Sequence, residues 1–355
     1  MPPDVVFAIP GDLATPTGGY GYDRELMAHL PEHGLSVEHL QLPGSFPMAS
    51  VPDLGETGYK LSQTSPNSVI LVDGLAYGAM TDIVLKDMDR TFVALVHHPL
   101  AHETGLSDRM RRALAASEKS ALKRAAHVVV TSPATARTLV GEFDVPSEKL
   151  TVALPGTDPA PRSAGSPDGT TLLCVGTVSP RKAYDVLARA LGGLKDLTWT
   201  CRIAGETDRV AGEFDRVRAV IDEEGLAGRI AFIGVLDRPA LDRAYACADI
   251  FLMPSLYEGY GMALAEAMAR GLPIVCTTGG AAAETVPDGA GLKVPPGDAP
   301  ALRHAIRVLL EDPARRRALS DGSWAAGRSL PTWSHTAGVV AETLKRVQAG
   351  MGGRT

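Results

Sequence analysis

The chain has few cysteines and few aromatic residues. Only four of its 355 residues are cysteine, and aromatic side chains make up 5%. No CxxC pair occurs, which argues against a disulfide-bonded scaffold and against a structural zinc domain. We expect the four thiols to act as small buried apolar groups in a reducing compartment. They are Cys174, Cys201, Cys247 and Cys276.

Long apolar runs and an excess of positive charge are also absent. No apolar run approaches the length of a membrane-spanning helix. The stretch Met1–Pro10 lacks the basic start and long apolar core of a signal peptide and instead predicts a buried strand. The net charge of −6 argues against a nucleic-acid partner. We therefore expect a cytoplasmic protein, and a length of 355 residues predicts two α/β domains.

Short apolar segments alternate with helical segments, a pattern typical of parallel sheets covered by helices. A stretch rich in proline, glycine, serine and alanine, 159–169, separates two such series and predicts a linker. We place an N-terminal Rossmann-like domain at 1–160 and a C-terminal one at 170–333. The expected strands include 68–74, 91–96, 127–131 and 150–154 in the first domain, and 171–176, 200–205, 230–234 and 248–253 in the second.

The segment that follows the last of these strands carries the clearest signal for function. A glycine-rich turn, Glu258 to Gly261, leads into a helix predicted over Met262 to Arg270, and Gly271 suits the helix end. A strand, a glycine turn and a helix N-terminus together present free backbone N–H groups and a positive dipole to an anion. This segment therefore predicts a phosphate site.

Two carboxylates flank this predicted phosphate site. Glu258 lies in the turn, and Glu266 lies about one helical turn inside the helix. Carboxylates accept strong hydrogen bonds from hydroxyl groups, so a ligand that carries hydroxyls must lie beside the phosphate. A nucleoside diphosphate sugar meets both requirements, with ribose hydroxyls on one glutamate and sugar hydroxyls on the other.

A cationic pair follows the first strand of the second domain. Arg181 and Lys182 lie at a strand-to-helix turn, where a planar guanidinium beside an ammonium can clamp a diphosphate. These fixed cations and the helix dipole can do what Mg²⁺ does elsewhere. The sequence offers no convincing DxD motif or His/Cys ligand cluster, so we expect no metal.

The two glutamates, set in PSLYEGYGMALAEAMARGLPIV, resemble the signature of family 4 retaining glycosyltransferases, enzymes of the GT-B fold. The resemblance covers nearly the whole chain and is strongest from Thr171 to Asp298. It implies two Rossmann-like domains facing across a cleft, with a C-terminal helix, 334–355, that crosses back to the N-terminal domain. It also implies a metal-independent hexosyltransferase that uses a nucleoside diphosphate sugar as donor and needs no cofactor.

The resemblance assigns roles to residues of the second domain. Glu258 would orient the transferred sugar and Glu266 the ribose, while the backbone at Gly259, Tyr260 and Gly261 would hold the phosphates. Lys182 would contact the diphosphate. Many members carry an arginine where this chain has Thr177, so we expect Arg181 to supply the second cation. The turn at Val235 would seat the nucleobase through backbone groups.

In the first domain, the resemblance implies that Gly18 and Gly19 form a loop over the donor phosphates and line the acceptor cleft, ahead of a helix that we predict from about Asp23. A functional histidine is expected at the end of the strand 91–96. His97 fits the family pattern better than its neighbour His98, and the sequence leaves the choice between them open.

Two other functions remain open from the sequence. One is a retaining sugar phosphorylase on the same scaffold, and the other is a two-domain binding protein without turnover. The donor base, the donor sugar, the acceptor and the oligomeric state are also undetermined. A basic helix, 108–126, could touch a membrane surface, although its interspersed acidic residues favour a solvated face.

Overall fold

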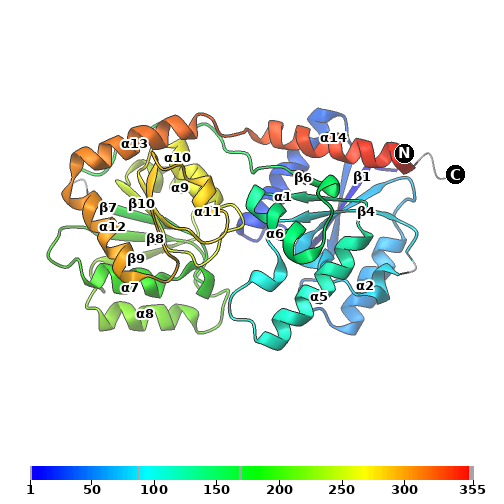
Figure 1. The fold of residues 1–355 in the computed structure, drawn as a ribbon, viewed down its shortest axis with the longest axis horizontal. Helices are drawn as coiled ribbons and strands as arrows, with labels where there is room; N and C mark the ends of the chain where they lie inside the picture. Colours follow the sequence, from blue (N-terminus) through cyan, green and yellow to red (C-terminus); the bar gives the residue numbers. More distant parts are fainter. Residues whose placement is uncertain (1, 87, 168–169, 352–355) are drawn as a thin grey trace. The chain divides into compact units, whose positions relative to one another are not determined.

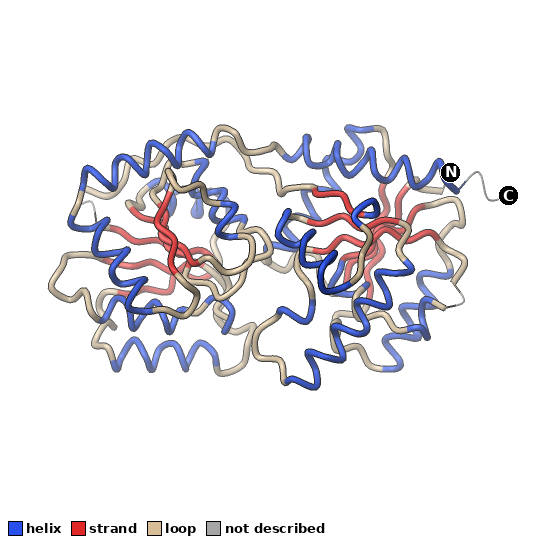
Figure 2. Tube along the Cα trace, in the orientation of Figure 1, coloured by secondary structure: helices blue, strands red, loops and turns tan. Residues whose placement is uncertain are grey.

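The computed structural model describes residues 2–86, 88–167 and 170–351. The chain divides into two compact units, Met1–Gly156 with Pro331–Thr355, and Thr157–Leu330. Each unit is a twisted sheet with helices on both faces (Figures 1 and 2). The boundaries fall a few residues before those predicted at 160 and 333. The last two residues of the predicted linker, 168 and 169, lie outside the described residues.

Unit 1 is built on a six-stranded parallel sheet with the order β2-β1-β3-β4-β5-β6. Its central strands are continuous apolar runs, as expected where helices cover both faces. The strands are β1 (Val5–Pro10), β2 (Val37–Leu42), β3 (Val69–Asp73), β4 (Thr91–Val96), β5 (His127–Val130) and β6 (Leu150–Val152). The helices are α1 (Gly18–His29), α2 (Val51–Ser62), α3 (Gly74–Tyr77), α4 (Asp82–Leu85), α5 (Asp108–Arg124), α6 (Pro133–Phe143) and α14 (Trp333–Met351).

Unit 2 contains a second six-stranded parallel sheet with the order β12-β11-β10-β7-β8-β9. This is the Rossmann order, and its direction reverses between β7 and β10, where such sheets bind ligands. The strands are β7 (Thr171–Val175), β8 (Thr200–Ala204), β9 (Ile230–Gly234), β10 (Ile250–Met253), β11 (Ile274–Thr277) and β12 (Gly291–Val294). The helices are α7 (Tyr184–Gly192), α8 (Glu213–Glu223), α9 (Arg238–Ala246), α10 (Met262–Ala269), α11 (Ala282–Thr285), α12 (Ala299–Glu311) and α13 (Pro313–Gly327).

The C-terminal helix α14 returns to unit 1, which confirms the expected crossing (Figure 1). The Thr336 hydroxyl donates to the Leu154 carbonyl at 2.7 Å, and Lys345 Nζ donates to the His33 carbonyl at 2.6 Å. The ring of Trp333 meets Tyr22 edge-on, with centroids 5.5 Å apart. The predicted end of this helix, 352–355, lies outside the described residues.

Helix α1 begins earlier than predicted. Thr17 has an extended backbone and its hydroxyl accepts from the Tyr20 amide, so α1 starts at Gly18 rather than near Asp23. Gly18 and Gly19 therefore form the first helical turn and not a loop. Glycine has low helix propensity, but the threonine cap offsets part of that cost.

The segment predicted to be a linker is fastened to unit 2 as far as the structure describes it. The Ser163 hydroxyl donates to the Ala246 and Ala248 carbonyls, each at 2.9 Å. Asp249 accepts hydrogen bonds from Ser166 and from the Thr171 amide. A composition that usually indicates a flexible connection thus forms ordered backbone along this unit.

The two passages of the chain between the units meet at Gly156. An added Cβ there would collide with the backbone of Thr332 and Trp333, which lie just after the return passage at Leu330–Pro331. Only a residue without a side chain permits this approach of backbone to backbone.

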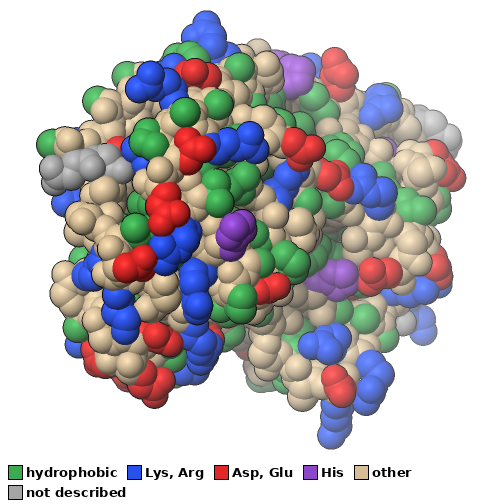
Figure 3. Space-filling model, turned by 60° about the vertical axis from the view of Figure 1, so that its left-hand side comes forward, with side chains coloured by type: hydrophobic (Ala, Val, Ile, Leu, Met, Phe, Trp, Pro, Cys, Tyr) green, Lys and Arg blue, Asp and Glu red, His purple; other side chains and the backbone are tan. Residues whose placement is uncertain are grey.

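Three of the four cysteines are buried, as predicted, but Cys247 is exposed. It follows α9 as the helix C-cap, so it lies at the surface although the strand after it is buried. On the face shown in Figure 3, positive and negative side chains are interspersed, as the near balance of 35 basic and 41 acidic residues suggests. No helix within the described residues combines the length and apolar character needed to cross a membrane.

Candidate functional site

The site residues predicted for the second domain gather at the reversal point of the unit 2 sheet. Strands β7 and β10 are neighbours there, with Leu172 opposite Ile250 and Leu173 opposite Phe251. The turn after β7 leads into a 3₁₀ turn, η4 (Pro180–Lys182), and the turn after β10 carries Glu258. Because both strands are parallel, both turns leave the same edge of the sheet.

Lys182, Arg181 and Glu258 form an ion-paired cluster at this edge. Lys182 Nζ lies 2.7 Å from Glu258 Oε1, and Arg181 Nη1 lies 3.4 Å from Glu258 Oε2. Burial alone would raise the pKa of Glu258, but the charges of Lys182 and then Arg181 outweigh it and hold this pKa at about 2. The carboxylate is 7% exposed and is ionised at neutral pH.

The backbone fixes this cluster from several sides. The Leu256 amide donates to the Arg181 carbonyl at 2.7 Å, which ties the turn after β10 to the turn after β7. Arg181 Nη1 also donates to the Tyr257 carbonyl at 2.9 Å. The alkyl chain of Lys182 lies against Gly176, where φ is 155° and an added Cβ would come within 2.9 Å of Lys182 Cε. Any other residue at 176 would therefore displace the ammonium group.

Helix α10 starts at Met262, after the glycine turn that follows Glu258, and points its N-terminus at the same edge. The N-cap Gly261 has φ of 92°, so Gly259, Tyr260 and Gly261 turn the chain sharply into the helix. No side chain caps the first turn. Uncapped amides at the positive end of a helix are suited to bind an anion, and this geometry is the one predicted from the sequence.

Glu266 lies one turn into α10 and is held by a tyrosine that sequence analysis missed. Tyr245, which is buried on α9, donates its hydroxyl to Glu266 Oε2 at 2.8 Å. The guanidinium of Arg270 lies over the Tyr245 ring, 4.6 Å from its centroid. Burial raises the pKa of Glu266, and the Tyr245 hydrogen bond and the charge of Arg270 oppose that rise. Tyr245 lies 21 residues before Glu266, so no local pattern links the two.

The remaining predicted positions of unit 2 lie beside this cluster in the sequence or at neighbouring strand ends. Val235 directly follows β9 and is 54% exposed, so its side chain takes no part in the core. Gly234 before it has φ of 70°, which turns the chain out of the strand. Thr177 lies in the turn between β7 and η4.

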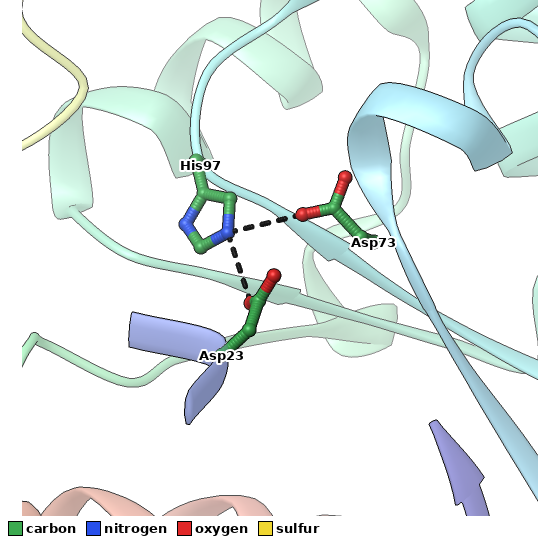
Figure 4. A group of neighbouring side chains, drawn as sticks. All are labelled: Asp23, Asp73 and His97. Carbon is green, nitrogen blue, oxygen red and sulfur yellow. Dashed lines mark hydrogen bonds and ion pairs between the residues drawn. The ribbon is translucent and has the colours of Figure 1, made fainter. Parts of the chain in front are cut away.

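The predicted residues of unit 1 meet around His97, at the end of β4. Its Nε2 lies 3.2 Å from Asp23 Oδ1 on α1 and 3.4 Å from Asp73 Oδ2 at the end of β3 (Figure 4). An added Cβ on Gly19 would lie 3.3 Å from His97 Cδ2, so this glycine leaves space for the ring. Sequence analysis missed both aspartates as partners of His97, because they come from separate elements.

His98 is placed differently. Its Nε2 lies 3.3 Å from Glu103 Oε2 on the same loop, and the Glu103 side chain is 43% exposed. An ion pair of this kind near the surface contributes little to the free energy of folding. The burial of its carboxylate partners makes His97 the stronger candidate of the two histidines.

The group formed by Asp23, Asp73 and His97 is also the place among the described residues where three side chains could surround a cation. One ligand atom from each lies within 4.8 Å of the other two. However, His97 Nε2 already lies within ion-pairing distance of both carboxylates. We therefore interpret the group as an ion-paired imidazole.

Comparison with known proteins gives a match in each unit. The model described as "Glycosyltransferase Family 4" matches residues 68–161, and the model described as "Glycosyl transferases group 1" matches residues 169–312. Among curated proteins, a D-inositol 3-phosphate glycosyltransferase of Nocardioides sp. is 29% identical over 257 residues, covering 65% of this chain and 56% of the relative. The enzyme of the same name from Mycobacterium sp. (strain KMS) is 30% identical over 208 residues, covering 55% of this chain and 47% of the relative. The chain thus spans about half the length of these curated relatives.

Solved structures are similar to the whole chain in fold. Sucrose-phosphate synthase from Thermosynechococcus elongatus superposes with a TM-score of 0.81 at 22% identity, covering 97% of this chain and 99% of that chain. HepE from Anabaena, in complex with UDP and glucose, superposes with a TM-score of 0.75 at 19% identity, again covering 97% and 99%. These likenesses agree with the two sheets and the returning helix α14 described above. The chain belongs to the family 4 glycosyltransferases and has the GT-B fold.

Proposed function

We propose that this protein is a retaining glycosyltransferase that transfers a sugar from a nucleoside diphosphate sugar to a hydroxyl group of an acceptor, without a metal ion. The bond between the anomeric carbon and the diphosphate oxygen breaks, and a bond from that carbon to the acceptor oxygen forms on the same face. The nucleoside diphosphate leaves with the electron pair of the broken bond, and its phosphate oxygen takes the proton that the acceptor hydroxyl loses.

The observation that carries this proposal is the cluster of Lys182, Arg181 and Glu258 at the uncapped start of α10. Two fixed cations and helix amides on one edge stabilise the charge that develops on a departing diphosphate. The adjacent carboxylate is ionised and buried, so it can accept hydrogen bonds from sugar hydroxyls. An apolar or singly charged ligand would not need this combination.

The relatives supply two further hints about substrates. HepE is named in complex with UDP and glucose, which supports a nucleotide-sugar donor. The curated relatives are named as D-inositol 3-phosphate glycosyltransferases, which makes phosphorylated polyols reasonable first acceptors to try. Because about half of each curated relative is matched, we treat donor and acceptor as questions for experiment.

The test is a thermal-shift panel of UDP, GDP, ADP and TDP sugars, followed by NMR of the product formed with the donor that binds. A donor at a hundred times its dissociation constant adds about 2.7 kcal/mol of stability. We expect one nucleotide series to stabilise the protein and the product to keep the anomeric configuration of the donor. An inverted product would contradict retention. Stabilisation by inorganic phosphate and a sugar 1-phosphate, with none by nucleotides, would favour a phosphorylase.

Replacing Glu266 by alanine should weaken binding of the free nucleoside diphosphate by about ten- to a hundredfold. A hydrogen bond to a charged group is worth roughly 1.5–3 kcal/mol, and each 1.4 kcal/mol is about tenfold in affinity. Calorimetric titration with the nucleotide measures the loss. The result expected for a ribose contact is that the matching 2′,3′-dideoxynucleotide binds wild type and variant equally.

Tyr245→Phe provides the matched control for Glu266. It keeps the aromatic ring under Arg270 and removes only the hydroxyl that donates to Glu266. We expect a smaller loss of nucleotide affinity than for Glu266→Ala, in the same direction. Unchanged affinity in both variants would remove the ribose assignment of Glu266.

Chelation should leave transfer intact. Arg181 and Lys182 supply fixed positive charge where a metal would otherwise neutralise the diphosphate, so turnover in EDTA should stay within about twofold of turnover in buffer with Mg²⁺. The measurement is the initial rate with and without chelator. Loss of transfer in EDTA and recovery on adding Mg²⁺ or Mn²⁺ would show that the cations of the chain are insufficient.

A further inference from the structure

The cluster around His97 combines features that the proposed reaction does not by itself require. It lies at the reversal point of the unit 1 sheet, between β1 and β3, where ligands bind in sheets of this kind. Asp73 ends β3 and pairs in register with Leu95, two residues before His97. Asp23 approaches from α1, which follows β1. Helix α1 and the ends of the neighbouring strands β3 and β4 thus bring two acids to one imidazole.

The geometry sets the protonation of one ring nitrogen. His97 Nε2 faces both carboxylates, at 3.2 Å and 3.4 Å, and these carboxylates are 0% and 3% exposed. An ionised carboxylate only accepts hydrogen bonds, so opposite an ionised acid Nε2 carries a hydrogen and donates it. Two buried acids beside one imidazole also favour its cationic form, because an unpaired buried charge is strongly unfavourable.

The other ring nitrogen is directed elsewhere. Figure 4 shows Nδ1 on the side of the ring away from Asp23 and Asp73. No residue in the described part of the chain hydrogen-bonds to Nδ1, and the His97 side chain, 20% exposed, is more accessible than the two nearly buried acids. A protonated ring thus has one N–H directed toward the acids and one available to a ligand.

The ring has little freedom to turn. Tyr22 meets it edge-on with centroids 5.3 Å apart, Gly19 lies against Cδ2, and the Thr131 hydroxyl donates to the His97 carbonyl at 3.2 Å. A flip of the imidazole would place carbon beside the acids and lose both contacts of Nε2. The orientation of Nδ1 is therefore fixed before any substrate arrives.

We propose that Asp23 and Asp73 are positioning residues that hold His97 as a fixed imidazolium, whose Nδ1–H donates to an oxygen of the substrate, either a phosphate oxygen or a sugar hydroxyl. His97 then acts as a charged hydrogen-bond donor and cannot serve as a general base. The identity of that oxygen rests on the proposed glycosyl transfer, but the charge state of His97 does not.

The titratable groups that face His97 are consistent with this proposal. Burial lowers the pKa of His97, but hydrogen bonds with Asp23 and Asp73 and their charges outweigh burial and raise it to about 10. Burial and the charge of Asp73 raise the pKa of Asp23 to about 7. Tyr22, the third titratable neighbour, stays neutral because burial raises its pKa. Among the described residues, Gly19, Thr131 and Thr135 also contact His97, and none of them titrates.

The experiment is an NMR titration of the protein labelled with ¹⁵N-histidine, in the absence of nucleotide sugar. The His97 signals are assigned by their loss in His97→Gln. We expect both ring nitrogens of His97 to keep imidazolium shifts from pH 5 to pH 8.5, a range over which an ordinary imidazole loses its proton. A His97 midpoint near 6.5 in the wild-type protein would overturn the proposal.

The isosteric variants separate positioning from mere structure. In Asp23→Asn/Asp73→Asn, no carboxylate opposes the effect of burial on His97, so the midpoint of the His97 titration should fall below pH 6.5. Rates should then fall as pH rises through that midpoint, while the wild-type rate shows no such limb below pH 8.5. His97→Gln should lower kcat/KM by about ten- to a hundredfold at all pH values, the cost of one charged hydrogen bond. Should the double variant not fold, the wild-type titration alone still decides.

Two other outcomes are distinguishable. If His97 is an imidazolium but no nucleotide sugar binds, the proposed function fails and the charge assignment stands. Calorimetric titration with Mn²⁺ and Zn²⁺ tests the competing use of the same three side chains. Stoichiometric binding that is lost in His97→Gln would overturn the proposal, because a metal on Nε2 requires that nitrogen to be unprotonated.

Stability gives an independent readout with a definite sign. The folded-state pKa of His97 is above its ordinary value of 6.5, so its pairing stabilises the fold fully below pH 6.5 and this contribution is lost as pH rises through about 10. The free energy of unfolding of wild type relative to His97→Gln should therefore decline over that window. A constant difference would contradict the pairing.

Discussion

Replacing Lys182 by methionine should lower turnover by about a hundred- to a thousandfold, the range typical for removing one donor from a preorganised anion site. Methionine keeps the apolar stem against Gly176 and removes the ammonium that lies 2.7 Å from Glu258. The charge on the diphosphate is largest as it leaves, so kcat should fall more than donor KM rises. Steady-state kinetics with the donor found by the thermal-shift panel measure both.

The matched control for Lys182 is Lys195→Met. Lys195 is a lysine of the same unit that donates to the Glu224 carbonyl at the surface, and its loss should leave turnover within about twofold. A Lys182→Met enzyme with wild-type kcat would show that Arg181 and the amides of α10 carry the leaving-group charge alone. Arg181→Ala, in turn, should be partly rescued by Thr177→Arg if the cation usual in the family has moved along this turn.

Replacing Glu258 by glutamine should lower turnover without weakening the binding of the nucleoside diphosphate. The carboxylate neutralises Lys182 and Arg181 in the ligand-free protein, so its loss frees both cations for an anionic ligand. We expect equal or tighter binding of the nucleoside diphosphate, by up to about tenfold, since that is the effect of roughly 1.4 kcal/mol. Turnover should fall by about a hundredfold, because the sugar loses the group that orients it.

Calorimetry with the nucleotide and kinetics with the nucleotide sugar test this prediction together. Glu223→Gln, at an exposed position on α8, is the control and should change neither quantity. The assignment would be wrong if Glu258→Gln weakened the nucleotide tenfold while leaving kcat unchanged. That outcome would place Glu258 on the nucleotide rather than on the sugar.

Much of unit 2 could be predicted from the sequence because its signals are local. The strand before Glu258, the glycine turn, helix α10 and the left-handed Gly271 after it all follow from residues within about twenty positions. Lys182 and Glu258 are 76 residues apart in the sequence. Their ion pair depends on the strand order, which puts β7 beside β10. The sequence supplied both partners but not their ion pair.

The contacts that the sequence analysis missed depend on tertiary packing, which no short sequence pattern indicates. Asp23, Asp73 and His97 come from three elements, and an aspartate at a strand end or in a helix is ordinary when seen alone. Tyr245 is an aromatic residue on a half-buried helix, which predicts core packing rather than a hydrogen bond to Glu266. The first turn of α1 was mistaken for a loop because glycine content outweighed the Thr17 cap in the prediction.

The contact at Gly156 has a consequence for how the chain tolerates change. Both passages between the units go by one point, where this glycine lies against the backbone of Thr332 and Trp333. The two segments that connect the units are therefore packed against each other at this position. A methyl group at position 156 would displace both segments at once, whereas a substitution at an exposed loop tip would affect neither. A library of random variants should accordingly be depleted of every side chain at this single position.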